Sequence, residues 1–448
     1  MPALLWLRRD LRLHDHPALL AAAEHGAVTA AFVLDDALRR PSGASRLAFL
    51  YRTLRSLRDD LAEHGGQLVI RSGRPEVVIP ALARAIGADS VHVSADFNPY
   101  GAARDERVRH ALGALDFVRT GSPYAVAPGR VTKDDGEPFK VYSAFYRRWR
   151  AHGYRAPARV EPAEISWGKP IDSDDVPADP APAATLRLPP AGERAARSAW
   201  AQFRQTRLDG YHDERDRPDL DHTSRLSPYL RFGTLHPRTL LHELTERPAH
   251  ETYRKELAWR EFYAAVLHFW PASARDYFRP ELKAMRHDTG PSADARLAAW
   301  QRGRTGFPIV DAGMRQLLAE GWMHNRVRMI VASFLVKDLH LEWTVGARHF
   351  MRHLVDADLA SNQHGWQWTA GTGTDAAPYF RIFNPTSQGK KFDPHGDYIR
   401  RYVPELRALP ATQIHEPIDR PDGYPEPIVD HSTERDESLA RYQAVRRS

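Results

Sequence analysis

Short apolar runs alternate with amphipathic stretches over the first 119 residues of the chain. The runs are Ala3–Leu7, Val28–Leu34, Gln67–Arg71, Ser90–Ser94 and Asp116–Arg119. The stretches between them include Ser45–His64 and Val77–Ile86. This alternation of strand and helix patterns predicts a doubly wound parallel sheet, whose ligands bind beyond the carboxyl ends of the strands.

From about residue 191 onward the pattern is helical. Within Arg326–Leu339 the apolar side chains recur at the spacing of one buried helix face. They are Val327, Ile330, Val331, Phe334 and Leu335. Residues 156–190 instead hold eight prolines and little periodicity, which indicates a connection between domains. We therefore predict an α/β domain over residues 1–125, a linker over 126–190 and an all-helical domain over 191–448.

Composition narrows the functional classes. The chain has 448 residues, no cysteine and a formal charge of +6. The lack of cysteine excludes disulfides, thiolate nucleophiles and cysteine-bound zinc, and it fits a cytoplasmic protein. No apolar run reaches the roughly eighteen residues of a membrane span, so we predict no membrane partner. The charge is compatible with a polyanionic partner, and the eleven tryptophans indicate either a Trp-rich core or rings used in stacking or redox chemistry.

Two polar patterns suit nucleic-acid recognition. Glu256, Trp259, Arg260 and Tyr263 share one face if residues 253–263 form a helix. A carboxylate, an indole and a guanidinium on one face suit stacking, hydrogen bonding and phosphate contact, although an exposed helix with ion pairs shows the same pattern. Asn325 and Met329 are four residues apart and would lie beside a base, or simply at a basic helix entry.

Other motifs point to phosphate chemistry or are set aside. Residues 223–228 combine three hydroxyls with Arg225 at an expected helix start, which suits a pyrophosphate but also an ordinary N-cap. Residues 356–368 are dense in polar and indole groups, but their acids lack a metal-ligand spacing and no metal is assigned. Residues 371–376 match GxGxxA outside any βαβ unit, so we reject a dinucleotide fingerprint. We interpret His14–His16 as a solvated loop.

The order of several motifs carries more information than any one of them. The series is Trp6–Arg12, Thr223–Leu230, Trp259–Tyr263, Gly321–Arg326, Trp366–Trp368 and residues 378–385. From the first strand to about residue 430, this series resembles the photolyase/cryptochrome family, and within it the class I cyclobutane pyrimidine dimer (CPD) DNA photolyases. The helical half carries the more specific part of the resemblance.

The resemblance implies an α/β antenna domain and a helical domain that binds FAD. The residues that match cofactor-binding positions are Tyr211, Thr223, Ser224, Arg225, Leu226, Ser227, Tyr253, Arg328, Asp356, Ala357, Asp358 and Asn362. Those that match DNA-binding positions are Arg215, Glu256, Trp259, Arg260, Tyr263, Asn325, Arg326, Met329 and Trp368. Glu256, Asn362, Trp366 and Trp343 match catalytic positions, and Arg328 and Asp356 match an ion pair beside the flavin.

The function implied is light-driven repair, in which excited reduced FAD passes an electron to a pyrimidine dimer in DNA and the ring opens. The expected protein is a monomeric deoxyribodipyrimidine photolyase. Three rivals remain: a cryptochrome photosensor, a (6-4) photoproduct repair enzyme and a non-enzymatic nucleic-acid binder. Asn362 favours repair over sensing, and Asn325 with Met329 stand where (6-4) enzymes have a His pair.

Two departures from the family pattern change the expectations. Trp366 and Trp343 match the first two members of a three-Trp relay that photoreduces FAD, but residues 285–291 hold no Trp for the third. We expect slow photoreduction, or electron exit through another ring such as Tyr277. In the antenna domain, Tyr100 and Gly101 replace the Asn-Glu pair of folate-binding members, which favours a deazaflavin or flavin as second chromophore.

Overall fold

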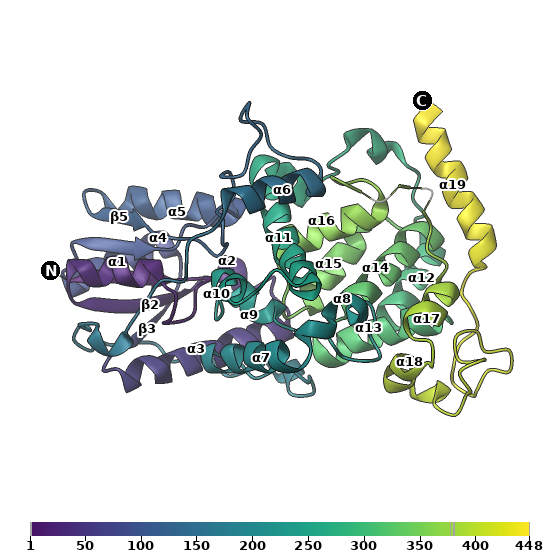
Figure 1. The fold of residues 1–448 in the computed structure, drawn as a ribbon, viewed down its shortest axis with the longest axis horizontal. Coiled ribbons are helices and arrows are strands. Elements are labelled where there is room, and N and C mark those ends of the chain that lie inside the picture. Colours follow the sequence, from purple (N-terminus) through teal and green to yellow (C-terminus); the bar gives the residue numbers. More distant parts are fainter. Residues whose placement is uncertain (1, 377, 380, 448) are drawn as a thin grey trace. The chain divides into compact units, whose positions relative to one another are not determined.

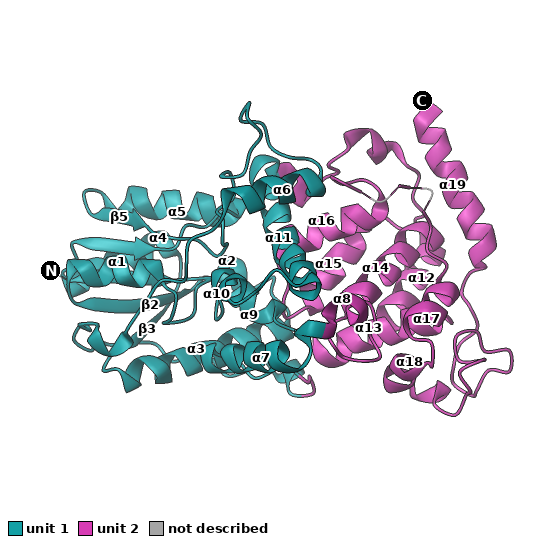
Figure 2. Cartoon of the chain, in the orientation of Figure 1, with its two compact units in different colours: residues 1–184, 188–209, 224–271 teal, residues 185–187, 210–223, 272–448 magenta. Residues whose placement is uncertain are grey.

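The computed structural model describes residues 2–376, 378–379 and 381–447. The chain forms two compact units, coloured separately in Figure 2. Unit 1 comprises residues 1–184, 188–209 and 224–271, and unit 2 comprises 185–187, 210–223 and 272–448.

The sheet of unit 1 has the predicted doubly wound topology. Its strands are β1 (Ala3–Leu7), β2 (Val28–Leu34), β3 (Leu68–Ser72), β4 (Ser90–Val93) and β5 (Asp116–Arg119), in the order β3-β2-β1-β4-β5 with every pairing parallel. Its helices are α1 (Pro17–His25), α2 (Asp36–Arg39), α3 (Ala44–Glu63), α4 (Pro75–Ile86) and α5 (Pro99–Leu112) (Figure 1). Strands β1 and β2 are buried along their whole length, as apolar strands are when helices cover both faces of a parallel sheet.

The Pro-rich segment 156–190 is irregular but closely held. The backbone N–H of Val28 donates to the carbonyl of Ser166 over 2.8 Å, and the N–H of Gly168 donates to the carbonyl of Val28 over 2.8 Å. The N–H of Asp174 donates to the carbonyl of Ile70 over 2.9 Å. These bonds satisfy backbone groups of β2 and β3 that would otherwise be exposed at the sheet edge. The segment contains only the short helices η1 (Pro162–Glu164) and η2 (Ala181–Ala183).

The interpretation of His14–His16 as a solvated loop is wrong for two of its three residues. Asp15 and His16 are buried, and only His14 is half exposed. The carboxylate of Asp15 accepts from Arg238 over 2.7 Å and from Thr239 over 3.1 Å. Local sequence patterns cannot predict partners that are so distant in the sequence. Their hydrogen bonds make it possible to bury the Asp15 carboxylate.

The remaining helices of unit 1 are α6 (Tyr142–His152), α7 (Glu193–Thr206), η3 (Leu208–Gly210, shared with unit 2), α9 (Ser227–Phe232), α10 (Pro237–His242) and α11 (Pro248–Phe269). Unit 2 contains α8 (Tyr211–Glu214), η4 (Pro271–Ala274, whose first residue is in unit 1), η5 (Pro280–Ala284), α12 (Pro291–Arg302), α13 (Pro308–Glu320), α14 (Asn325–Ser333), η6 (Phe334–Asp338), α15 (Trp343–His353), α16 (Leu359–Ala370), α17 (Pro385–Phe392), α18 (Asp397–Tyr402), η7 (Pro404–Leu406) and α19 (His431–Arg447). Among the described residues, no helix is both long and apolar enough to cross a bilayer.

The predicted buried face of residues 326–339 is confirmed, because all five of its apolar side chains are buried in the core of unit 2. The helix is not uniform, however. It is α-helical to Ser333 and then makes a π-helical turn over Phe334–Asp338. Lys337 and Asp338 lie within this wider turn, and both are buried.

Candidate cofactor and DNA sites

A stacked pair of rings stands out on α11 of unit 1. The indole of Trp259 lies parallel to the ring of Tyr142 on α6, with centroids 3.7 Å apart and an interplanar angle of 10°. The hydroxyl of Tyr142 donates to the carbonyl of Lys255 over 2.7 Å, which fixes the ring. Trp259 is still partly exposed, so the stack holds an indole at the surface in one orientation.

The other predicted residues of this helix face have mixed surroundings. Glu256 and Tyr263 are partly exposed, and the Tyr263 ring lies 5.3 Å from Trp259. Arg260 donates to the carbonyls of Pro123 and Leu230 over 3.0 and 3.1 Å. Its guanidinium therefore already ties α11 to two other segments of unit 1.

Sequence reasoning missed Glu261, which is fully buried beside this face. Its carboxylate accepts from the backbone N–H of Ala125 over 2.5 Å and of Val126 over 3.1 Å, and from the indole N–H of Trp149 over 2.6 Å. Burial nevertheless raises the pKa of Glu261 to about 7, because desolvation of the charged form outweighs these donors. A signal was present, since Glu261 falls at helical spacing from the apolar Leu257.

The predicted hydroxyl-rich segment has a strained backbone. Arg225 has φ of +50°, which side chains rarely adopt, and such strain is typical of functional positions. The hydroxyl of Tyr253 donates to Ser224 Oγ over 3.0 Å, and the Tyr253 ring packs against Trp200 and Phe203. Tyr253 therefore fixes the position of Ser224 from within the core of unit 1.

In unit 2 the predicted ion pair is present. Arg328 donates to Asp356 Oδ2 over 2.8 Å and to the carbonyl of Met323 over 2.8 Å. Asp356 Oδ1 is buried without a hydrogen-bond partner among the described residues, and so is Thr223 Oγ1. Buried polar atoms are normally paired. These two unpaired oxygens therefore fit a polar ligand such as the ribityl or phosphate part of a flavin.

Helix α16 carries Asn362, Trp366 and Trp368 of the predicted residues, and Asp358 is its N-cap. Asp358 caps its start by accepting from the N–H of Ser361 over 3.1 Å. The amide nitrogen of Asn362 donates to the carbonyl of Ala347 over 3.2 Å and to Gln363 Oε1 over 2.8 Å. Trp366 lies one turn further along and is buried. Two acceptors thus fix the amide plane of Asn362.

The remaining predicted residues of unit 2 are spread over its surface and interior. Asn325 is exposed at the start of α14, while Arg326 pairs with Asp216 over 2.7 Å and approaches Met329 Sδ to 3.8 Å. Arg215 lies 5.9 Å from the ring of the buried Tyr211. Ala357 is buried and Trp368 is partly exposed. Asn325 and Trp368 are therefore accessible from solvent.

Side chains beyond the carboxyl ends of β1, β2 and β4 form a polar cluster in unit 1. Arg8 donates to Asp105 over 2.8 Å and also bonds the carbonyl of Ser94. Tyr100 donates to Asp35 over 2.5 Å. A Cβ on Gly101 would lie 2.1 Å from Asp96 Oδ2, so no larger residue fits there unless Asp96 moves. This is the edge where doubly wound sheets bind ligands.

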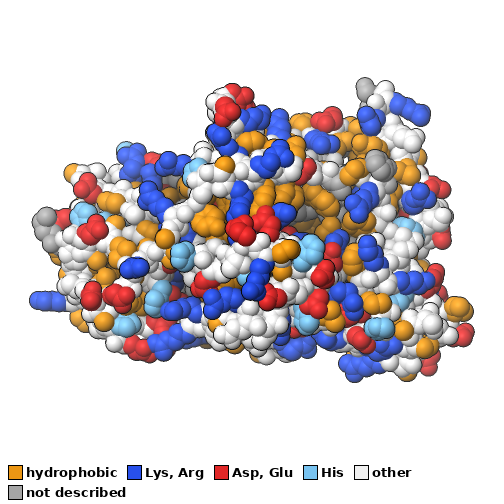
Figure 3. Space-filling view, viewed as in Figure 1, with side chains coloured by type: hydrophobic (Ala, Val, Ile, Leu, Met, Phe, Trp, Pro, Cys, Tyr) orange, Lys and Arg blue, Asp and Glu red, His pale blue; other side chains and the backbone are white. Residues whose placement is uncertain are grey.

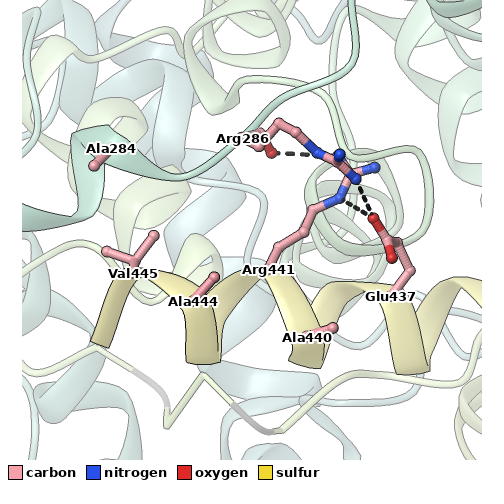
Figure 4. Close-up of a pocket in the computed structure, with 7 residues that line it drawn as sticks. All are labelled: Ala284, Arg286, Glu437, Ala440, Arg441, Ala444 and Val445. Carbon is pink, nitrogen blue, oxygen red and sulfur yellow. Dashed lines mark hydrogen bonds and ion pairs between the residues drawn. The ribbon is translucent and has the colours of Figure 1, made fainter. Parts of the chain in front are cut away.

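Two other surface features are not part of the predicted sites. A pocket of about 410 Å³ lies between α19 and residues 284–286, where Arg286 and Arg441 both contact Glu437 (Figure 4).

On the face seen in Figure 3, Lys and Arg side chains are interspersed with Asp and Glu, so the positive charge does not form one patch there. Across the described ranges, no three His, Asp or Glu side chains converge as a metal site.

Comparison with known proteins covers nearly the whole chain. The family model "DNA photolyase" matches residues 3–163, and "FAD binding domain of DNA photolyase" matches residues 253–444. The deoxyribodipyrimidine photo-lyase of Halobacterium salinarum is 39% identical over 99% of both chains. A bacterial class III photolyase from Agrobacterium tumefaciens superposes with a TM-score of 0.92 at 37% identity, covering 100% of this chain and 98% of that one.

Two further solved structures are more distant in sequence. An archaeal photolyase from Sulfolobus tokodaii, described with two FAD molecules that imply a novel light-harvesting cofactor, has a TM-score of 0.87 at 29% identity and covers 99% of this chain and 100% of that one. A cryptochrome from Synechocystis has a TM-score of 0.88 at 27% identity and covers 98% and 99%.

Proposed function

The chain belongs to the photolyase/cryptochrome family, and on this premise we propose that it is a DNA repair enzyme that splits cyclobutane pyrimidine dimers with light. FAD, when bound and reduced, supplies the electron that opens the dimer. The observation that carries the proposal is the partly exposed Trp259, held by its stack on Tyr142, with Glu256 on the same helix face. A damaged base pair stacks poorly, so an aromatic platform can hold an extruded dimer at low cost.

The roles of the individual residues follow from their chemistry. Glu256 would accept or donate a hydrogen bond at a pyrimidine edge, while Trp259 and Trp368 would stack on the dimer. Asn325 and Met329 would contact its bases, and Arg215, Arg260, Tyr263 and Arg326 would steady the DNA around it. For the cofactor, Tyr211, the segment from Thr223 to Ser227 and Tyr253 would bind FAD, with that segment at its pyrophosphate. Arg328, Asp356, Ala357, Asp358 and Asn362 would contact the flavin and its side chain.

The choice between rival functions rests on the similarities. A photosensor role is not favoured, since the curated relative and the structure with the highest TM-score reported above are both photolyases. The Agrobacterium protein is described as class III, so the class I subtype stays a prediction. The CPD specificity rests on Asn325 and Met329, because a (6-4) enzyme would present a His pair at those positions.

We also propose a deazaflavin or flavin, rather than folate, as the second chromophore. The close approach of Gly101 to Asp96 supports this, because the glutamate of a folate-type site has no room at position 101. The remaining expectations also stand as proposals: a monomer in the cytoplasm, with an antenna domain over 1–125, a linker over 126–190 and a helical domain over 191–448.

Replacing Glu256 tests the proposed dimer pocket. We expect Glu256→Gln to lower the yield of light-driven repair of a CPD-containing oligonucleotide by roughly tenfold or more, as loss of a positioned proton-sharing group commonly does. The matched control is Glu246→Gln, an exposed carboxylate before α11 that pairs with Arg150. Equal repair yields for wild type and Glu256→Gln would contradict the assignment.

The Tyr142–Trp259 stack gives a second prediction. Tyr142→Leu removes the ring that orients Trp259, so binding of dimer-containing DNA should weaken by about 1 kcal/mol, the value of an aromatic pair. Tyr142→Phe keeps the stack and should bind within twofold, roughly, of wild type. Fluorescence anisotropy with damaged and undamaged oligonucleotides measures this, and unchanged affinity of Tyr142→Leu would show that the stack is only structural.

A further inference from the structure

Trp366 and Trp343 of unit 2 lie on the packed helices α16 and α15, and the Trp343 ring contacts the partly exposed Tyr277. The Trp366 ring lies directly against Gly346 of α15, where an added Cβ would be 2.2 Å from Trp366 Cη2. Trp343 is one turn away on the same helix, and its ring centroid is 6.0 Å from that of Tyr277. The contacts therefore continue from α16 through α15 to the loop that carries Tyr277.

The loop around Tyr277 is fixed to the same helix as Trp366. The side chain of Gln367, which is fully buried, accepts from the N–H of Phe278 over 2.8 Å. Its amide nitrogen donates to the carbonyls of Ser273 over 2.9 Å and Asp276 over 3.2 Å. Three bonds from one side chain hold the loop on both sides of Tyr277, so the ring is pre-positioned rather than mobile.

Two other rings beside Trp366, those of Trp300 and Phe350, offer no terminal electron donor. Trp300 lies 6.1 Å from Trp366, but it is fully buried and its indole N–H donates to the carbonyl of Val331. A carbonyl cannot take the proton of an oxidised indole, and no external reductant reaches a fully buried ring. Phe350, 5.0 Å from Trp366, is too hard to oxidise. Among the ring contacts of the described residues, the branch through Trp343 alone reaches a partly exposed, oxidisable ring.

Tyr277 has what the tryptophans lack, which is a base for its proton. Its hydroxyl lies 3.0 Å from Nε2 of His287, and the carboxyl of Glu342 is a second polar neighbour of the same hydroxyl. Burial lowers the pKa of His287, so the imidazole is neutral near pH 7, and its bond with the backbone of His340 fixes the ring. The indole N–H of Trp343 is buried without a hydrogen-bond partner among the described residues. Oxidised Trp343 would therefore keep its proton and remain a strong oxidant of its neighbour.

We propose that Tyr277 is the terminal electron donor in photoreduction of the FAD, and that His287 accepts the phenolic proton. This inference rests on the proposed flavin function. The oxidant is photoexcited oxidised FAD, which would take one electron from Trp366. Trp343 then reduces the oxidised Trp366, and Tyr277 reduces the oxidised Trp343. The O–H bond of Tyr277 breaks as its electron leaves, and an N–H bond forms on His287 Nε2. An external thiol then returns one electron to the tyrosyl radical, and the proton comes back from His287.

Flash photolysis of the FAD-loaded full chain tests the proposal. In wild type we expect a neutral tyrosyl radical, identified by the narrowing of its electron paramagnetic resonance spectrum when tyrosine is ring-deuterated. Its formation should be slower in D2O, because the electron and the proton move together. Tyr277→Phe should abolish the signal, and Tyr442→Phe, on α19, should leave it unchanged.

Two further variants separate the roles of the ring and the base. His287→Gln should slow formation of the tyrosyl radical by about 10²-fold, the usual contribution of a positioned proton acceptor. Tyr277→Trp should restore a long-lived radical that is tryptophanyl and insensitive to D2O. A tyrosyl signal that persists in Tyr277→Phe, or a wild-type radical that is tryptophanyl, would overturn the proposal.

The failure of this inference can be told from failure of the repair function. Tyr277→Phe that has been reduced chemically bypasses the relay, so it should repair dimers as well as wild type. Normal repair without a wild-type tyrosyl radical would reject only the role of Tyr277. Absence of bound FAD, or of repair by chemically reduced wild type, would reject the proposed function and the inference with it.

Discussion

Asp356→Ala is expected to lose most of the bound FAD. The substitution removes a buried carboxylate, leaves Arg328 without its 2.8 Å partner and deletes the buried oxygen that has no partner within the described structure. Loss of one member of a buried pair commonly costs about 3 kcal/mol, which corresponds to roughly a hundredfold in Kd. The measurement is titration calorimetry of the FAD-free protein with FAD.

A matched carboxylate serves as the control for this substitution. Asp397 also pairs with an arginine, Arg400, over 3.1 Å, but its side chain is more than half exposed. Exposed pairs contribute little, so Asp397→Ala should bind FAD as wild type does. If Asp356→Ala binds FAD with unchanged Kd, Asp356 does not belong to the cofactor site.

Glu261→Ala is expected to destabilise unit 1 by several kcal/mol. The substitution leaves the buried N–H groups of Ala125 and Val126 and the buried indole N–H of Trp149 without an acceptor. Each unpaired buried donor lowers the free energy of unfolding by about 1–3 kcal/mol. The cavity left by the side chain adds to the loss. Urea denaturation followed by circular dichroism measures the change, and a midpoint equal to that of wild type would contradict this account of Glu261.

The same residue makes stability depend on pH. The pKa of Glu261 is raised in the folded protein from its ordinary value of 4.5 to about 7, so the folded state binds this proton more tightly than the unfolded state. Its contribution is complete below about pH 4.5 and is lost as pH rises through about 7. Glu261→Gln does not titrate, so the free energy of unfolding of wild type should fall relative to that of the variant across this window. Parallel pH profiles would refute the shifted pKa.

Local patterns predicted the parts of the molecule that depend on neighbours in sequence. Strands β1, β2 and β5 have the predicted ends, and β3 and β4 differ only by a residue at their ends, because strand ends depend on partner strands. The buried face of residues 326–339 followed from periodicity alone. The π-helical turn within it did not, because the spacing of apolar residues does not separate a single π-helical turn from the α-helix around it.

The site shows the same division. The Arg328–Asp356 pair could be placed because a family resemblance supplied both positions. Several contacts of the site join segments that are more than a hundred residues apart. They are the stack of Trp259 on Tyr142, the bond of Asp15 with Arg238 and the three donors on Glu261. Tertiary contacts of this kind decide whether a polar residue is a surface group or a buried anchor, and no local pattern carries them.

The most direct test of the central claim is light-dependent splitting of a defined dimer. Purified full-length protein, with its FAD chemically reduced, would be mixed with an oligonucleotide that carries one cyclobutane thymine dimer, and a second sample would carry a (6-4) photoproduct. Recovery of thymine absorbance under blue light, in the first sample only and not in the dark, is the predicted result. No recovery of the cyclobutane dimer despite bound and reduced FAD would contradict the account.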